Sequence, residues 1–409
     1  MPRPIVVCLS NTDWGFLRYR KQHLMERLSR YADVVYVNPP RALKSQDWAL
    51  YRRTRTLSRS LRVHEPFVMP GMRRWPISRW LTYRWLAARL SVWCAHRQVV
   101  LWLYSPHGLP FIDLLRPDRV VYDIADLHAT PSGKTLRDEG ERGEIDMLAR
   151  LEKELLARAD VALCVSEPLV ERVRDRSRRV VLVPNGCDWN RYRDDPSALE
   201  FKSFSTLDSR TPLRVGYIGT LAPRVDAELL AAVARRRPEW SIELVGPTLP
   251  FFDVKPLASM RNVVMTGEIP FEQVPAALAT FDVCVLPLRE IDFAYYCSPI
   301  QVFDYLAAGK PVVSTPVGQL EEWGGLVHIA RGADEFIAAI ERASHERTVD
   351  HVLRRRAFAA RNSWDTRVSQ IAGVLSSLGV PLDHALADRR GSASASEATA
   401  AFSNQDSAA

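Results

Sequence analysis

The chain has 409 residues, of which 47% are hydrophobic and 25% are charged, and its formal net charge is +7. This length favours two domains over one, and the composition is that of an ordinary globular protein. The sequence contains no apolar run approaching the roughly 18 residues of a membrane-spanning helix, and the apolar stretch at its start is too short for a signal peptide. We therefore expect a cytoplasmic protein, with the inner face of the membrane as the alternative location.

In the first half of the chain, short apolar runs rich in β-branched residues alternate with helical stretches. The runs cover residues 5–10, 33–38, 99–105, 119–126, 159–166 and 179–186. This alternation predicts a parallel sheet covered by helices on both faces, and hence a Rossmann-like domain over residues 1–190. Sheets of this kind bind ligands beyond the carboxyl ends of their strands, where several of these runs pass into small, polar, turn-forming residues.

The excess positive charge lies between Arg41 and Arg97, a segment with 13 Lys and Arg, two acids and five tryptophans. Its helical part, residues 77–97, spreads arginine and tryptophan around the helix axis, whereas a helix at a membrane interface segregates them. We therefore favour a packed helix whose arginines reach out to solvent. Contact of residues 41–97 with a membrane surface is the alternative. Nucleic acid is disfavoured, because zinc-ligand spacing and RNA-binding aromatic motifs are absent from the sequence.

Asp123, Asp126 and His128 cluster where the run at 119–126 leaves the predicted sheet. Paired carboxylates with an imidazole can hold sugar hydroxyls or transfer a proton. The alternative is that the aspartates cap the loop. Their spacing is not that of a closed zinc site, and the six cysteines occur singly, so we expect no bound metal.

Residues 191–212 are charged, rich in serine and aperiodic, which indicates a linker. Beyond them the strand-like runs begin again, at residues 213–219, 240–246, 262–267, 281–288, 310–316 and 325–330. We expect a second Rossmann-like domain over residues 213–351, with the site in the cleft between the two domains. A helix over residues 352–380 is expected to pack back on the first domain. The tail, residues 385–409, is rich in alanine and serine and is expected to be disordered.

The second domain opens with a strand that ends at Gly219, a short loop, and a helix beginning near Asp226. This is not the G-x-G-x-x-G pattern, so a dinucleotide-dependent oxidoreductase loses its main support. Arg224 lies in the loop, where its guanidinium can bind phosphate oxygens. The alternative is a surface arginine that pairs with Asp226.

The segment 298–318, "SPIQVFDYLAAGKPVVSTPVG", places a carboxylate among apolar residues. Ser298 as N-cap, Pro299 at the first position and Gln301 in a capping box predict a helix from about Pro299 to Ala308. The start of such a helix favours an anion, and Asp304 lies one turn deeper, where it can accept hydrogen bonds from two ribose hydroxyls. The alternative is that Asp304 is a solvent-facing charge.

These motifs resemble those of the GT-B glycosyltransferases, and most closely the retaining family four (glycosyl transferases group 1) of bacterial surface polysaccharide synthesis. The resemblance covers roughly residues 4–378. It is carried by "GYIGTL", "LVGP", "NVVMTGEIP", "VLPL" and above all "SPIQVFDYLAAGKPVVST", with "PNGCD" and "NSWDTR" also matching.

The resemblance implies the GT-B fold, with two Rossmann-like domains facing a cleft, and a hexosyltransferase-type enzyme that is retaining and metal-independent. It would move a sugar from a nucleotide-sugar, a substrate and not a cofactor, to a glycan or lipid-linked acceptor. The donor residues implied are Gly219, Arg224, Gly246, Pro287, Ser298, Pro299, Gln301 and Asp304.

The first domain is expected to bind the acceptor. The loop after the first strand matches the family's cleft-facing loop, which makes Asp13, Trp14, Gly15 and Arg20 the acceptor candidates. Asp126 and His128 are the catalytic candidates.

The sequence departs from the family pattern at several positions. Asp304 replaces the usual glutamate, and Gln301 a frequent lysine. Thr220 and Asp226 stand where a basic pair usually holds the pyrophosphate, and Tyr296 where an earlier glutamate is usual. An inactive GT-B scaffold and a sugar-nucleotide epimerase therefore remain as alternative functions.

Overall fold

The computed structural model describes residues 2–40, 54–72, 74–126, 139–194 and 212–384. The first domain contains an eight-stranded sheet with the order β3-β4-β2-β1-β5-β6-β7-β8. Its pairings are parallel except that β3 runs antiparallel to β4. Its strands are β1 (Ile5–Leu9), β2 (Asp33–Val37), β3 (Thr54–Ser58), β4 (Leu61–His64), β5 (Val99–Leu103), β6 (Arg119–Ile124), β7 (Val161–Cys164) and β8 (Val180–Leu182).

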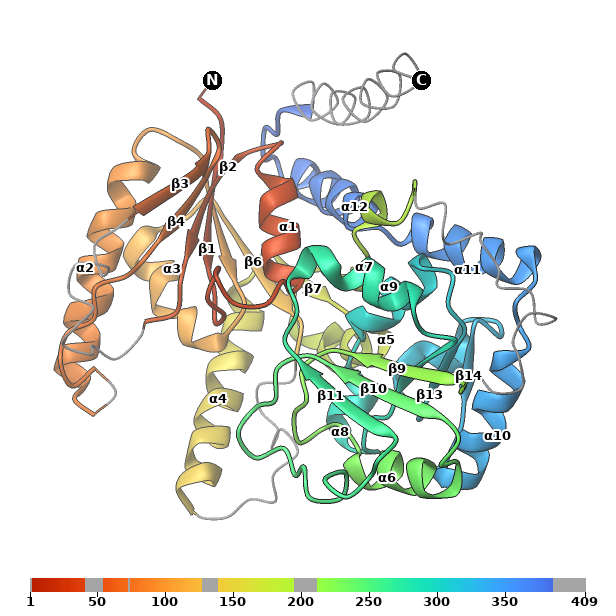
Figure 1. Cartoon of the computed structure of the whole chain (residues 1–409). Coiled ribbons are helices and arrows are strands. Elements are labelled where there is room, and N and C mark those ends of the chain that lie inside the picture. Colours follow the sequence, from red (N-terminus) through yellow and green to blue (C-terminus); the bar gives the residue numbers. More distant parts are fainter. Residues whose placement is uncertain (1, 41–53, 73, 127–138, 195–211, 385–409) are drawn as a thin grey trace.

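Helices cover both faces of this sheet (Figure 1). They are α1 (Arg20–Leu28), α2 (Pro76–Cys94), α3 (Pro110–Leu115), α4 (Glu139–Arg158) and α5 (Glu167–Val173). The strands β3 and β4 were not predicted, since they lie in the arginine-rich segment, and most of β3 is exposed.

The second domain contains a six-stranded parallel sheet with the order β11-β10-β9-β12-β13-β14. The strands are β9 (Arg214–Ile218), β10 (Ser241–Val245), β11 (Val263–Gly267), β12 (Val283–Leu286), β13 (Val312–Ser314) and β14 (Val327–Ile329). Its helices are α6 (Ala227–Arg236), α7 (Val274–Ala279), α8 (Asp292–Tyr296), α9 (Ile300–Ala307), α10 (Gly332–Ser344) and α11 (Val349–Arg361), and the chain continues into α12 (Trp364–Ser377). The prediction of two doubly wound α/β domains is confirmed.

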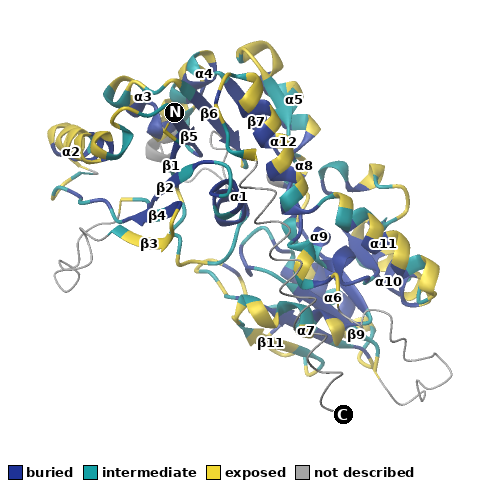
Figure 2. Ribbon diagram, turned by 90° about the horizontal axis from the view of Figure 1, so that it is seen from above, coloured by how far each residue is buried: buried dark blue, intermediate teal, exposed yellow. Residues whose placement is uncertain are grey.

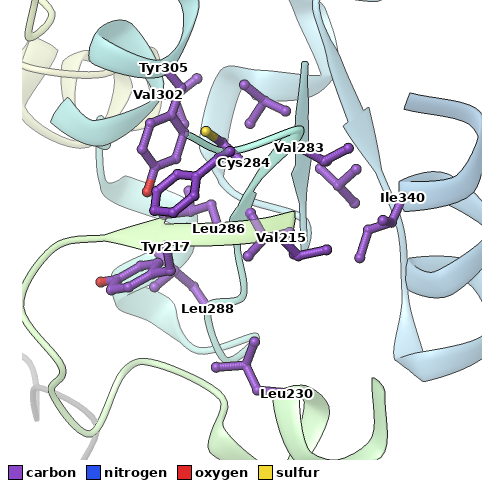
Figure 3. Close-up of a cluster of buried hydrophobic side chains, with 14 of the residues drawn as sticks. Val215, Tyr217, Leu230, Val283, Cys284, Leu286, Leu288, Val302, Tyr305 and Ile340 are labelled. Atoms are coloured by element: carbon purple, nitrogen blue, oxygen red, sulfur yellow. The ribbon is translucent and has the colours of Figure 1, made fainter. Parts of the chain in front are cut away.

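The central strands are buried on both faces, which explains why they read as continuous apolar runs. In β1, Ile5, Val6, Val7 and Cys8 are all at most 1% exposed. One apolar cluster lies on each face of the first sheet, and a further cluster fills the second domain. Figure 3 shows part of that third cluster, with side chains from β9, β12 and α9 packed together.

The C-terminal helix α12 packs on the first domain, beside α1 (Figure 1). The buried ring of Trp364 stacks on His23, with 5.0 Å between ring centroids. Asp365 accepts hydrogen bonds from Arg27 at 3.0 Å and from Arg30 at 2.6 Å. The last helix therefore links the second domain back to the first.

The motifs "PNGCD" and "NSWDTR" meet at this link. The backbone N–H of Trp364 donates to the carbonyl of Cys187 at 2.9 Å. A Cβ added to Gly186 would lie 2.4 Å from the carbonyl oxygen of Asn362. Only glycine therefore allows the two backbones to approach this closely.

We predict that Gly186→Ala destabilises the protein by roughly 1–3 kcal/mol, because two backbone segments must separate to accept the methyl group. Gly373→Ala is the matched control, since Gly373 lies exposed in α12 with no heavy atom within 4 Å of its added Cβ. Urea unfolding of both variants gives the comparison. A Gly186→Ala protein as stable as the wild type would contradict this account of the link.

Candidate functional site

A pocket of about 1000 Å³ lies between the two domains. Its lining comes largely from segments that follow the carboxyl ends of strands in both sheets, β1, β6 and β8 in the first and β9, β10, β11 and β12 in the second, and from the start of α9. This is the position at which doubly wound sheets bind ligands. The two sheets therefore present their binding edges to the same space.

Hydrogen bonds join the domains around the pocket. The side-chain amide of Asn185 donates to the carbonyl of Ser298 at 2.6 Å, and the hydroxyls of Tyr19 and Thr220 lie 3.0 Å apart. The hydroxyl of Ser166 donates to the carbonyl of Tyr296 at 2.7 Å. The structure thus describes the two domains in direct contact.

The helix α9 is anchored by its apolar face. Val302 and Tyr305 are fully buried and pack onto β9 and β12 (Figure 3). The hydroxyl of Tyr305 accepts from the backbone N–H of Ile218 at 2.9 Å and donates to its carbonyl at 3.2 Å. This fixes the helix against the end of β9, with Gln301 and Asp304 lining the pocket.

The predicted capping box at Ser298 is wrong. The N-cap of α9 is Pro299, in an extended conformation and without a side-chain cap. Ser298 instead serves the domain contact, since its hydroxyl accepts from the backbone N–H of Asn185 at 3.3 Å. The first backbone N–H groups of α9 therefore have no side-chain cap. They lie at the pocket, whose lining at this point includes Ser298, Pro299 and Gln301.

Asp304 is half-buried in the pocket lining. The hydroxyl of the buried Tyr192 donates to its Oδ1 at 3.1 Å. Burial raises the pKa of this carboxyl to about 7, an effect that Tyr192 and the nearby Arg191 oppose. The ligand-free protein thus holds a carboxyl group that is only partly ionised at neutral pH.

Two glycines bring the ends of β9 and β10 together at the pocket. Gly246 has φ 141°, and a Cβ there would lie 2.1 Å from the carbonyl oxygen of Gly219. Both glycines and Arg224 line the pocket. Pro287 lies outside the lining found among the described residues, where its carbonyl accepts from the N–H of Asp226 at 2.7 Å.

The candidates from the first domain divide into two groups. Arg20 and Asp126 line the pocket, whereas His128 lies outside the described residues. Among the described residues, Asn11, Thr12 and Phe16 belong to the lining of the pocket, whereas the predicted Asp13, Trp14 and Gly15 do not.

Local structure accounts for these last residues. Asp13 accepts from the N–H of Gly15 at 2.8 Å within the turn, and Trp14 packs edge-on against Tyr36. Contacts within the turn and with Tyr36 therefore engage these side chains, while the neighbouring Thr12 and Phe16 line the pocket.

Arg20 is buried and binds other residues of the first domain. It is 2% exposed, its Nε lies 3.0 Å from Oδ1 of the fully buried Asp123, and its Nη1 donates to the carbonyl of Val183 at 2.9 Å. The adjacent Lys21, which also lines the pocket, was not predicted as a site residue. The basic run Arg18–Lys21, which follows the loop after the first strand, was the signal that could have identified it.

Among the residues that the structure describes, no group of three or more His, Cys, Asp or Glu side chains is placed to hold a metal ion. Nor does any helix there combine the length and apolarity needed to cross a bilayer.

We predict that Asp304→Asn stabilises the ligand-free protein at about pH 8. The folded-state pKa of about 7 exceeds the ordinary 3.8, so above pH 7 folding must keep a half-buried carboxyl ionised. The penalty shrinks as the pH falls from about 7 toward 4, because the folded state takes up the proton first. Asparagine does not titrate, so its advantage should fade by about pH 5.

Melting temperatures at the two pH values test this prediction. Asp334→Asn, at an exposed carboxylate paired with Arg236, is the control and should show no comparable gain. An Asp304→Asn protein that is less stable than the wild type at about pH 8 would mean that the carboxylate stabilises the fold.

Comparisons with known proteins agree with this geometry. A family model described as glycosyl transferases group 1 matches residues 212–346. The Bacillus subtilis (strain 168) protein TuaH, named as a teichuronic acid biosynthesis glycosyltransferase, is 28% identical over 330 residues. These cover 76% of this chain and 80% of the relative.

Solved structures of low sequence identity share the fold. Sucrose-phosphate synthase from Thermosynechococcus elongatus has a TM-score of 0.70 at 17% identity, covering 92% of this chain and 99% of that one. HepE from Anabaena, in complex with UDP-glucose, has a TM-score of 0.65 at 18% identity, covering 91% and 99%. The fold, the family match over residues 212–346 and the relative together support a glycosyltransferase with the GT-B fold, as the resemblance stated from the sequence implied.

Proposed function

We propose that the pocket binds a nucleotide-sugar and transfers its hexosyl group to a glycan or lipid-linked acceptor in cell-surface polysaccharide synthesis. The observation that carries this proposal is the carboxyl of Asp304, held in the pocket lining one turn below the start of α9. HepE forms complexes with UDP and UDP-glucose, and TuaH is named for teichuronic acid biosynthesis. Both names support a nucleotide-sugar donor and a glycan product.

The donor would bind mainly to the second domain. Asp304 would accept hydrogen bonds from two ribose hydroxyls, which favours its ionised form and compensates for its burial. The diphosphate would lie at the start of α9, where the helix carries the equivalent of about half a positive charge. Gln301 and Arg224 line the pocket on the same side and would supply further donors.

Two departures from the family pattern have structural explanations. Asp226 is the N-cap of α6, and its side chain accepts from the N–H of Leu229 at 3.0 Å. Thr220 pairs with Tyr19 of the first domain. In our proposal neither position binds phosphate, so Arg224, Gln301 and the α9 N–H groups carry that role.

Catalysis would stabilise the negative charge that develops on the leaving diphosphate. The α9 dipole and the Arg224 guanidinium supply this stabilisation in our proposal, without a metal or another cofactor. Asp126, on the first-domain side, would hold the attacking acceptor hydroxyl, with His128 as its partner. Retention of the anomeric configuration is proposed from the family resemblance.

We predict that UDP, GDP, TDP or ADP raises the melting temperature, and that Asp304→Asn weakens binding of the best nucleotide at least roughly tenfold. Asp334→Asn is again the control. Absence of stabilisation by all four nucleotides would contradict a donor site. Unchanged affinity in Asp304→Asn would remove Asp304 from it.

We also propose that the protein contacts a membrane surface, and the structure of α2 supports this. One face of α2 packs on the domain through Thr82, Leu86 and Leu90. The opposite face leaves Ile77, Trp80, Leu81, Trp85 and Val92 between 37% and 70% exposed. Much of the outer surface of α2 is exposed in Figure 2.

Apolar residues occur on both faces of α2, so tryptophan is not confined to one side of the helix axis. Arg84 lies over the ring of Trp80, at 4.9 Å from its centroid. Residues 66–112 contain six arginines and no acid. An exposed apolar face with cations and no anions suits an anionic bilayer better than a second copy of this chain, whose arginines would repel it.

We predict that the wild type co-sediments with vesicles containing phosphatidylglycerol and that Trp80→Ala/Trp85→Ala reduces this binding roughly tenfold or more. Phe251→Ala, at an exposed aromatic of the second domain, is the control. Equal binding of the double variant and the wild type would contradict docking through α2.

A further inference from the structure

Lys21 is a buried cation in the first-domain side of the pocket. It is the second residue of α1, is 7% exposed, and lines the pocket. Its Nζ donates to Oγ1 of Thr12 at 2.9 Å and lies 5.3 Å from the ring centroid of Tyr104. Within the described ranges, no carboxylate lies within ion-pair distance of this ammonium group.

The neighbouring cations differ from Lys21 in this respect. Arg18 pairs with Glu26 at 2.5 Å, and Arg20 pairs with Asp123 at 3.0 Å. An ammonium group has three donors, of which the Thr12 hydroxyl uses one. The carboxylates of Asp126 and Asp123 act on this cation through space. Burying a cation without an anion in contact with it is costly, so an anionic ligand that reached Nζ would stabilise Lys21.

The position of the ammonium group is well defined. The backbone carbonyl of Thr12 accepts from the hydroxyl of Tyr36 at 2.7 Å and from that of Ser10 at 2.8 Å. The N–H of Thr12 donates back to Ser10 at 3.0 Å. These bonds hold Thr12 in place at the end of β1, and Thr12 in turn holds Lys21. Lys21 is therefore a buried side chain held in a defined position, and not a solvated surface lysine.

The location of Lys21 indicates which substrate would supply the anion. Asp304, Arg224 and the start of α9 lie on the second-domain side, whereas Lys21 shares the first-domain side with Asp126. We infer that Lys21 binds an oxyanion of the acceptor, a sugar carboxylate or phosphate, which orients the attacking hydroxyl. This inference rests on the proposed function, because it presumes that the donor occupies the other side.

Ligand-observed NMR with UDP present can test the inference with three probes, D-glucuronate, D-glucose 6-phosphate and D-glucose. We expect at least one anionic sugar to bind roughly tenfold or more tightly than glucose, as one ion pair in a desolvated site would give. The two anionic probes distinguish a carboxylate from a phosphate. Equal binding of all three sugars, or no binding, would overturn the inference.

Lys21→Met keeps the length of the side chain and removes its charge, whereas Lys21→Arg keeps the charge. The preference for the anionic sugar should disappear in the first variant and persist in the second, with UDP affinity unchanged in both. A loss of UDP affinity in Lys21→Met would assign Lys21 to the donor and overturn the inference. Melting curves show that each variant is folded.

The outcomes separate this inference from the proposed function. If none of UDP, GDP, TDP and ADP binds the wild type, the donor proposal fails, and the probes are then measured without a nucleotide. A Lys21-dependent preference for anionic sugars would still support the anion site in that case. If UDP binds and the preference is absent, only the Lys21 inference fails.

Discussion

The attachment of α9 to the core of the second domain is the constraint on which the site depends. The apolar face of this helix is buried, and the Tyr305 hydroxyl pairs with both backbone groups of Ile218 at the end of β9. Because the helix cannot rotate, Asp304 must remain in the pocket lining even though burial raises its pKa to about 7. A fold selected for stability alone would place an apolar or amide side chain there.

The two sides of the pocket carry complementary chemistry. The second domain offers a carboxyl for hydroxyl groups and a helix start for an anion, and the first domain offers Asp126 and the buried Lys21. The contacts of α12 with α1, and of Asn185 with Ser298, hold these two sides against each other. The geometry of the link at Gly186 therefore matters to the site as well as to stability.

Much of the fold was predictable because buried parallel strands leave a simple pattern. The run at residues 5–10 is apolar throughout because β1 is central, whereas β3 carries mostly exposed residues and left no such pattern. The site was less predictable. Ser298 has the local sequence of an N-cap, but a partner 113 residues away, Asn185, engages it instead. Such long-range contacts cannot be read from local sequence.

The same limit explains the first-domain residues. Asp13 and Trp14 were chosen because they lie in the loop after β1, but they make contacts within the first domain, and Thr12 and Lys21 line the pocket instead. In the sequence, the apolar residues on the two faces of α2 likewise looked scattered around the helix axis. Only the packing of Leu86 and Leu90 shows which face is left exposed.

The central claim, that Asp304 binds the ribose of the donor, is tested most directly by a double-mutant cycle. The affinities of wild type and Asp304→Asn are measured for a nucleoside diphosphate and for its 2′,3′-dideoxy analogue. If the carboxylate accepts both ribose hydroxyls, the wild type should discriminate against the analogue by roughly tenfold or more and the variant should lose most of that discrimination. Equal discrimination by the two proteins would show that Asp304 does not contact the ribose.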